Sequence, residues 1–88
     1  MPYRVEISPA AERNLRAISA APREILARAI YALGDELRPI GVRKIRGAQN
    51  AWRIRVWDFH IVYEVCDDRS LVLIIKVDRR RERTYRRI

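Results

Sequence analysis

The sequence predicts an α+β domain, with an N-terminal strand and a helical hairpin packed on one face of a twisted, mainly antiparallel sheet of four to five strands. Two patterns support this fold class. Apolar residues recur at helical spacing in the first half of the chain, and they alternate with polar residues or run together in the second half. The length of 88 residues is typical of one domain, so we expect residues 1–88 to form a single unit.

A short strand and a helix are expected first. The stretch "YRVEI" alternates and predicts a strand at about residues 3–7. Ser8 can then cap a helix, and Pro9 suits the first helical position. The apolar face of this helix has residues at i, i+4 and i+7, which are Ala11, Leu15 and Ile18.

A second helix is expected from about Pro22 to about Leu37, after a break at "SAAP". Pro39 and Gly41 then end the helical pattern. Because the link between the helices is short, we expect a hairpin whose outward faces carry mixed charge. The apolar positions of the second helix again lie at helical spacing, at Ile25, Leu26, Ala29, Ile30, Leu33 and Leu37.

The rest of the chain is predicted to be β-structure. "VRKIRG" (42–47) is a short strand or an extended arm, and "AWRIRVW" and "FHIVYEV" form a hairpin that turns near Trp57 and Asp58. "DDR" (67–69) predicts a turn. The nearly all-apolar "SLVLIIKV" (70–77) predicts a central strand that is covered on both faces.

Positive charge is concentrated in the second half of the chain, whose overall net charge is +8. Residues 43–88 carry thirteen Lys and Arg against six acidic residues, a net of +7, whereas residues 1–42 carry a net of +1. Seventeen of the nineteen basic residues are Arg, which contacts phosphate through two parallel hydrogen bonds. The concentration of basic residues in the second half therefore predicts a binding site for a polyanion.

Other features bear on where the protein works. The sequence contains no stretch of about 18 apolar residues, so no membrane span is predicted. The first fourteen residues lack the apolar centre of a signal peptide. Cys66 is the only cysteine, which excludes an internal disulfide and favours a cytoplasmic protein.

The predicted hairpin places basic side chains on one face of the sheet. Side chains alternate along a strand, so Arg53, Arg55 and Trp57 share the face that the helices leave open. A turn at 57–58 puts Arg55 opposite His60. Arg53 and Arg55 lie about 7 Å apart along the strand, which is close to the spacing of adjacent phosphates in single-stranded RNA.

His60, the only histidine, has two interpretations. It is either a solvent-facing strand residue or a phosphate contact and proton-transfer group beside Arg55. A lone His, with no Cys or carboxylate grouping at ligand spacing, predicts no metal site, and no small-molecule cofactor is expected. Trp57 either stacks on a base or packs at the edge of the turn.

A basic tail follows the last predicted strand. Aromatic and basic residues that alternate are typical of surfaces that clamp a nucleic-acid backbone and stack its bases. A solvated tail is the alternative, most of all for Arg86 and Arg87. The tail residues expected to contact nucleic acid are Arg79, Arg80, Arg81, Arg83 and Tyr85.

Together, "SPAAERNL", "KIRG", the basic hairpin and the ending "VDRR" resemble the RelE/ParE superfamily of toxins from bacterial toxin–antitoxin systems. The resemblance covers essentially the whole chain and favours the RelE-like branch. It implies a RelE-like fold and a type II toxin that inhibits translation. Enzymes of that branch are ribosome-dependent endoribonucleases (mRNA interferases), which cut mRNA without metal by attack of a 2′-OH on the adjacent phosphate.

The resemblance also implies roles for individual residues. The two basic residues of the first hairpin strand match Arg53 and Arg55, the Arg after the last strand matches Arg80, and the C-terminal Tyr matches Tyr85. His60 stands where the family has Arg, and, because Arg stays protonated, His60 or Tyr85 is expected to move protons. The RNA-binding candidates are Lys44, Arg46, Arg53, Arg55, Trp57, Arg79, Arg81 and Arg83.

The partners implied by the resemblance are the ribosome, mRNA and a cognate antitoxin that is acidic where it covers the basic face. Two other functions stay open. A ParE-like toxin poisons DNA gyrase without being a nuclease, and a degenerate toxin only binds its antitoxin and RNA. The "WRIRV" pair and the Arg/Tyr tail favour the nuclease, whereas His60 and Trp57, which depart from the family pattern, keep the degenerate toxin open.

Overall fold

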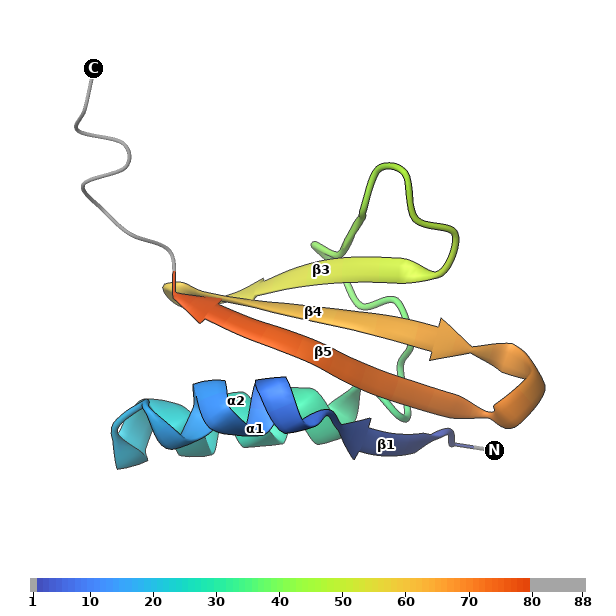
Figure 1. Cartoon of the computed structure of the whole chain (residues 1–88). Helices are drawn as coiled ribbons and strands as arrows, with labels where there is room; N and C mark the ends of the chain where they lie inside the picture. The colour runs from blue at the N-terminus through green and yellow to red at the C-terminus, as the bar shows by residue number, and fades with distance from the viewer. Residues whose placement is uncertain (1, 80–88) are drawn as a thin grey trace, which may run out of the picture.

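A five-stranded mixed sheet is covered on one face by two helices in the computed structural model, which describes residues 2–79 (Figure 1). The strand order is β1-β5-β4-β3-β2, with β1 parallel to β5 and every other pair antiparallel. This arrangement confirms the predicted α+β class. The elements are β1 (Arg4–Ile7), α1 (Pro9–Arg16), α2 (Ala20–Ala32), β2 (Arg43–Lys44), β3 (Ala51–Val56), β4 (Phe59–Cys66), the single 3₁₀ turn η1 (Asp67–Arg69) and β5 (Leu71–Arg79).

Ser8 fixes the start of α1, as predicted. Its Oγ accepts a hydrogen bond from the backbone N–H of Ala11 at 3.1 Å, and Pro9 occupies the first turn. The same hydroxyl donates to the carbonyl oxygen of Ile75 on β5, also at 3.1 Å. One side chain therefore caps the helix and ties it to the sheet.

Within residues 2–79, neither helix is long and apolar enough to cross a membrane.

The second helix is shorter than predicted. α2 ends at Ala32, whereas the periodicity predicted a helix to about Leu37. The chain leaves the helix at Gly34, whose carbonyl oxygen accepts a hydrogen bond from the N–H of Tyr3 at 2.8 Å. A Cβ at Gly34 would lie 2.5 Å from the Tyr3 carbonyl oxygen, so only glycine fits this approach. The contact with the chain before β1 thus overrides the helical pattern.

The core lies between the helices and the sheet. Every second residue of β4 is buried from Phe59 to Val65, as the alternation predicted. Tyr63 is completely buried, and its hydroxyl donates to the carbonyl oxygen of Leu37 at 2.8 Å, which holds the segment after α2. The buried apolar residues that pack together in this core are Ala11, Leu15, Leu26, Ile30, Leu33, Phe59, Ile61, Tyr63, Val65, Val72, Ile74 and Val77.

A β-bulge that the sequence pattern did not predict interrupts β5. Val62 of β4 pairs with Lys76, but the next residue, Tyr63, pairs with Ile74. Ile75 is therefore an extra residue with no partner of its own in the β4 ladder.

The bulge changes which side chains of β5 face the helices. Ile74 is buried and Val77 is buried, three residues apart instead of two. Lys76 and Asp78 consequently point to the open face of the sheet. The backbone N–H of Val77 donates to Oδ1 of Asn14 at 3.0 Å, so α1 supplies a partner for the strand just beyond the bulge.

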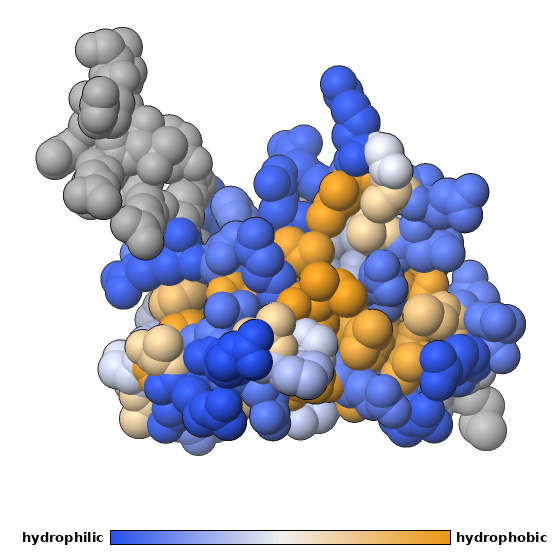
Figure 2. All heavy atoms as spheres, viewed as in Figure 1, coloured by the Kyte–Doolittle hydropathy of each residue, from blue (hydrophilic) through white to orange (hydrophobic). Residues whose placement is uncertain are grey.

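The open face of β5 corrects the prediction of a strand covered on both faces. The helices cover one face only, and Leu73 and Ile75 remain partly exposed. Figure 2 shows apolar surface emerging between the charged side chains on the viewed side of the molecule. The apolar run in this strand thus reflects its central position in the sheet rather than cover on both sides.

Gly34→Ala should lower the free energy of unfolding by about 3 kcal/mol, because the new methyl group would overlap the Tyr3 carbonyl oxygen. Urea unfolding followed by circular dichroism measures this loss. Gly47→Ala is the matched control, since nothing lies within 4 Å of a Cβ there and only its positive φ adds about 1 kcal/mol. Equal losses in both variants would contradict the proposed close approach at Gly34.

Tyr63→Phe should weaken the alkaline pH dependence of stability. Burial raises the pKa of Tyr63 to about 12, from an ordinary Tyr pKa of 10. Between these values the unfolded chain binds fewer protons than the folded chain, so stability falls as pH rises. The variant should lose this contribution, and at pH 7 it should be less stable by about 1 kcal/mol because the bond to Leu37 is gone.

Chemical denaturation at pH values from 7 to about 11 measures both effects. Tyr31→Phe is the control, because Tyr31 is 57% exposed. An identical pH dependence for wild type and Tyr63→Phe would show that burial of this hydroxyl has no part in alkaline unfolding.

Candidate nucleic-acid interface

A basic hollow of about 480 Å³ lies on the open face of the sheet. Residues of β3, β4 and β5 form its floor, and the end of β2 and the loop after it form its rim. The residues that line the basic hollow are Lys44, Ile45, Arg46, Arg53, His60, Val62, Lys76 and Asp78.

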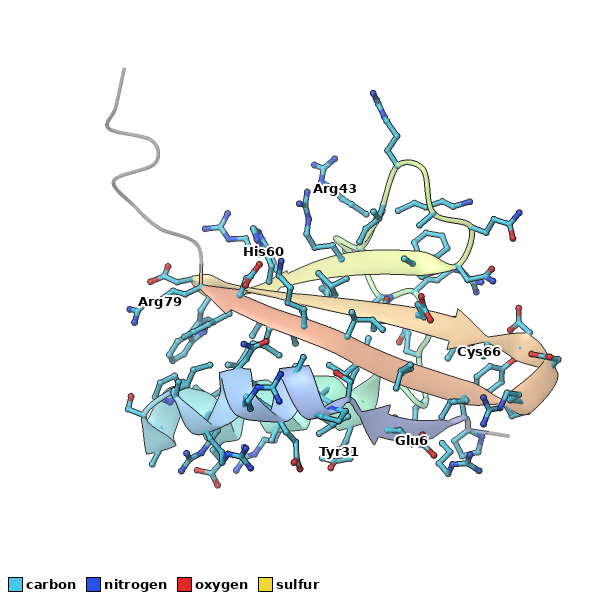
Figure 3. All side chains as sticks on the ribbon, in the orientation of Figure 1. Glu6, Tyr31, Arg43, His60, Cys66 and Arg79 are labelled. Atoms are coloured by element: carbon cyan, nitrogen blue, oxygen red, sulfur yellow. The ribbon has the colours of Figure 1, made fainter. Side chains whose placement is uncertain are left out.

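The strand register brings together the arginines and the histidine that the sequence singled out. Arg55 and His60 are direct cross-strand partners, as predicted. Arg53 pairs with Val62 on β4 and with Arg43 on β2. Figure 3 shows His60 and Arg43 on the side of the sheet away from the helices. Alternation along β3 thus displays basic side chains beside an imidazole.

Cations outnumber carboxylates around the basic hollow. Lys44, Arg46, Arg53 and Lys76 line it, and Asp78 is the one carboxylate among its lining residues in the described part of the chain. Oδ2 of Asp78 lies 3.0 Å from Nζ of Lys76, so this carboxylate pairs with one of the four cations. The remaining positive charge favours an anion such as a phosphate group.

The hairpin turn holds Arg55 in place. Its Nε donates to the carbonyl oxygen of Trp57 at 2.9 Å. The terminal amino groups of a guanidinium carry four further N–H donors, which can contact an anion beside His60. Anchoring one end of the guanidinium reduces the rotamer freedom that would be lost on binding.

Trp52 supports the rim of the basic hollow. Nζ of Lys44 lies 5.8 Å from the centre of its ring, and Cζ of Arg38 lies 5.1 Å from it, both within cation–π distance. The indole Nε1 is buried and has no hydrogen-bond partner within residues 2–79. The ring therefore orients Lys44, a role that sequence reasoning missed because it depends on the pairing of Lys44 with Trp52.

Trp57 and Arg79 line a second cleft and not the basic hollow. This cleft, of about 710 Å³, lies between the β3–β4 turn and the α1–α2 link, where Ile18 and Pro22 also line it. Trp57 is 64% exposed and has a φ of 57°, which costs a non-glycine residue about 1–2 kcal/mol. The positive φ breaks the strand alternation, so Trp57 does not share the basic hollow with Arg53.

Four of the predicted site residues, Arg80, Arg81, Arg83 and Tyr85, lie outside the described residues, and their roles stay predictions. Conversely, Lys76 and Asp78 were not among the predicted catalytic or RNA-binding residues; the sequence favoured a salt bridge on the basic face for Asp78, and its ion pair with Lys76 agrees with that. Within residues 2–79, no group of three or more His, Cys, Asp or Glu side chains is arranged to hold a metal ion.

Toxins of toxin–antitoxin systems are among the solved structures with this fold. The isolated E. coli RelE toxin is 23% identical, with a TM-score of 0.80 over 96% of this chain and 92% of its own. A chain of the archaeal RelE–RelB complex from Pyrococcus horikoshii is 24% identical, with a TM-score of 0.80 over 93% and 99%. A chain of the Mycobacterium tuberculosis RelBE2 complex is 21% identical, with a TM-score of 0.80 over 91% and 100%. At these identities the likeness shows the fold.

Among curated protein sequences, none matches this chain. A family model is more informative, because it matches residues 5–84 and so spans nearly all of the helices and strands. It describes the ParE toxin of the type II toxin–antitoxin system parDE. The chain therefore belongs to the ParE toxin family, within the RelE/ParE superfamily of type II toxin–antitoxin toxins.

Proposed function

We propose that this toxin is an endoribonuclease that inhibits translation by cutting mRNA on the ribosome without a metal ion. The observation that carries the proposal is the position of His60, an imidazole in a hollow whose other charged groups are mostly cations. Cations bind phosphate, and an imidazole can take or give a proton near neutral pH. The RelE-like enzymes that the sequence resembles carry out this chemistry.

The reaction needs a base, an acid and a clamp for the phosphate. In our scheme His60 takes the proton of a 2′-OH, and that oxygen attacks the adjacent phosphorus. Arg53 and Arg55 stabilise the negative charge that develops on the phosphate oxygens. The 5′-oxygen leaves with a proton from Tyr85, giving a 2′,3′-cyclic phosphate and a 5′-OH. Arg80 completes the clamp, and its role and that of Tyr85 rest on the sequence.

The proposed partners are a cognate antitoxin, the ribosome and its mRNA, in the cytoplasm. The solved structures with this fold include toxin–antitoxin complexes from Mycobacterium tuberculosis and E. coli. A net charge of +8 suits an acidic antitoxin segment as well as an RNA backbone. Both partners would compete for the same open face of the sheet.

Gyrase poisoning is the second candidate, and the match to the ParE model favours it. A ParE-like toxin acts on DNA gyrase and does not cut RNA. A supercoiling assay with purified gyrase separates the two candidates. Inhibition of supercoiling by a protein that leaves mRNA intact on the ribosome would reject the nuclease and support gyrase poisoning.

Arg53→Gln should weaken the binding of single-stranded RNA and reduce the slope of log K against log salt by about 0.7–1. Arg53 lines the basic hollow, where it can neutralise a phosphate. Arg28→Gln is the matched control, because the Arg28 side chain is 80% exposed on α2. Fluorescence anisotropy at about 50–200 mM salt measures the slope. Equal changes in both variants would mean that RNA binds exposed basic side chains anywhere on the protein and has no preference for the basic hollow.

Ribosome-dependent cleavage of mRNA in the presence of chelator is the expected activity of the wild-type toxin. His60→Ala should lower the cleavage rate at least about 100-fold, since a general base contributes 10²–10⁴-fold. Arg28→Gln should leave the rate unchanged. Product ends are mapped by primer extension, and a cyclic phosphate is expected. Unchanged cleavage in both His60→Ala and Tyr85→Phe would reject their proton-transfer roles.

A further inference from the structure

A carboxylate lies opposite His60 on the neighbouring strand β5. His60 lies between two direct cross-strand partners, Arg55 on β3 and Asp78 on β5. His60 and Asp78 both line the basic hollow. Residues directly opposite each other in antiparallel strands have Cβ atoms about 4.5–5.5 Å apart, which is within reach of a contact between a carboxylate and an imidazole.

We propose that Asp78 is a positioning residue, which orients the His60 imidazole and keeps it basic. A carboxylate that accepts a hydrogen bond from one ring N–H determines the tautomer and leaves the other ring nitrogen as the proton acceptor. It also stabilises the imidazolium that forms when the proton is taken. The catalytic meaning of this pair rests on the proposed nuclease function, whereas the coupling between the two side chains does not.

The other charged groups around His60 oppose its protonation, and a carboxylate offsets them. Like charges disfavour the protonated imidazole, and an opposite charge favours it. A ring surrounded by cations alone is a weak base, which limits proton transfer. Asp78 opposes this effect from β5. The cations around His60 are Arg43, Arg53 and Arg55, which share its face of the sheet by strand register, and Lys44, Arg46 and Lys76, which line the basic hollow with it.

The ion pair with Lys76 is compatible with this role. Lys76 Nζ contacts Oδ2 of Asp78 at 3.0 Å. A carboxylate has two oxygens with about four acceptor positions, so the same group can also accept from an imidazole. Lys76 and Asp78 are two residues apart on one face of β5, and their contact holds the carboxylate against the sheet.

The bulge gives independent support, because it creates this pairing. If Ile75 were paired in a regular ladder instead of bulged, strand alternation from Ile74 would point Asp78 toward the helices. With it, Asp78 lies opposite His60 and Val77 enters the core. The local structure of β5 thus places a carboxylate beside the only imidazole of the chain.

The proposal can be tested by titration, because His60 is the only histidine and its ring signals need no further assignment. By two-dimensional ¹H–¹⁵N NMR, we expect Asp78→Asn to lower the pKa of His60 by about 0.5–1 unit and to mix the tautomers. Asp78→Glu should restore most of the effect. Lys76→Gln should raise the pKa of His60. Asp68→Asn, in η1 beyond the other end of β4, is the matched control and should change neither quantity.

Cleavage assays on the same variants separate this inference from the proposed function. In a nuclease, Asp78→Asn should shift the pH profile of cleavage by the same amount as the titration, and Asp68→Asn should not. An unchanged pKa and tautomer in folded Asp78→Asn would overturn the inference, whether or not the toxin cuts RNA. A shifted titration in a toxin that cuts no mRNA would support the coupling and reject the nuclease.

Discussion

One extra residue in β5 determines what this toxin buries and what it displays. A bulge leaves backbone groups without partners in the ladder, and buried groups of this kind need other partners. α1 supplies them on both sides of the bulge, because Ser8 Oγ donates to the Ile75 carbonyl and Asn14 Oδ1 accepts from the Val77 N–H. The bulge and the helix therefore stabilise each other. The basic hollow on one face and the core on the other both depend on this contact.

Structural features that depend only on residues close together in the sequence could be predicted from it. Ser8 and Pro9 mark the start of α1 because a helix cap needs only a few neighbouring residues. The alternation of 51–65 determines which side chains of the hairpin face the helices, and a two-residue turn then sets the register. The pairing of Arg55 with His60 follows from these two facts alone, so the β3–β4 side of the candidate site could be predicted from the sequence.

Structural features that depend on contacts between residues far apart in the sequence could not be predicted. α2 ends early because Gly34 meets Tyr3, a neighbour only in the folded chain. The bulge at Ile75 leaves no mark in the sequence, since Leu71 to Ile75 are all apolar and either phase of the strand is plausible. The position of Lys76 in the basic hollow could not be predicted for the same reason. An apolar run predicts a strand but does not say which of its residues is the extra one.

The pairing of the first strand with the last has a consequence for how the molecule is made. The hydrogen bond from Ser8 to Ile75 joins residues 67 positions apart, and the one from Tyr3 to Asp67 spans 64. Contacts so distant in sequence form slowly and only after both partners exist. A chain grows from its N-terminus at about 5–20 residues per second, so β5 is synthesised after the other strands within residues 2–79. The nascent chain therefore has neither a closed core nor a complete basic face until β5 has been synthesised, so the ribosome must pass this strand before the domain can fold.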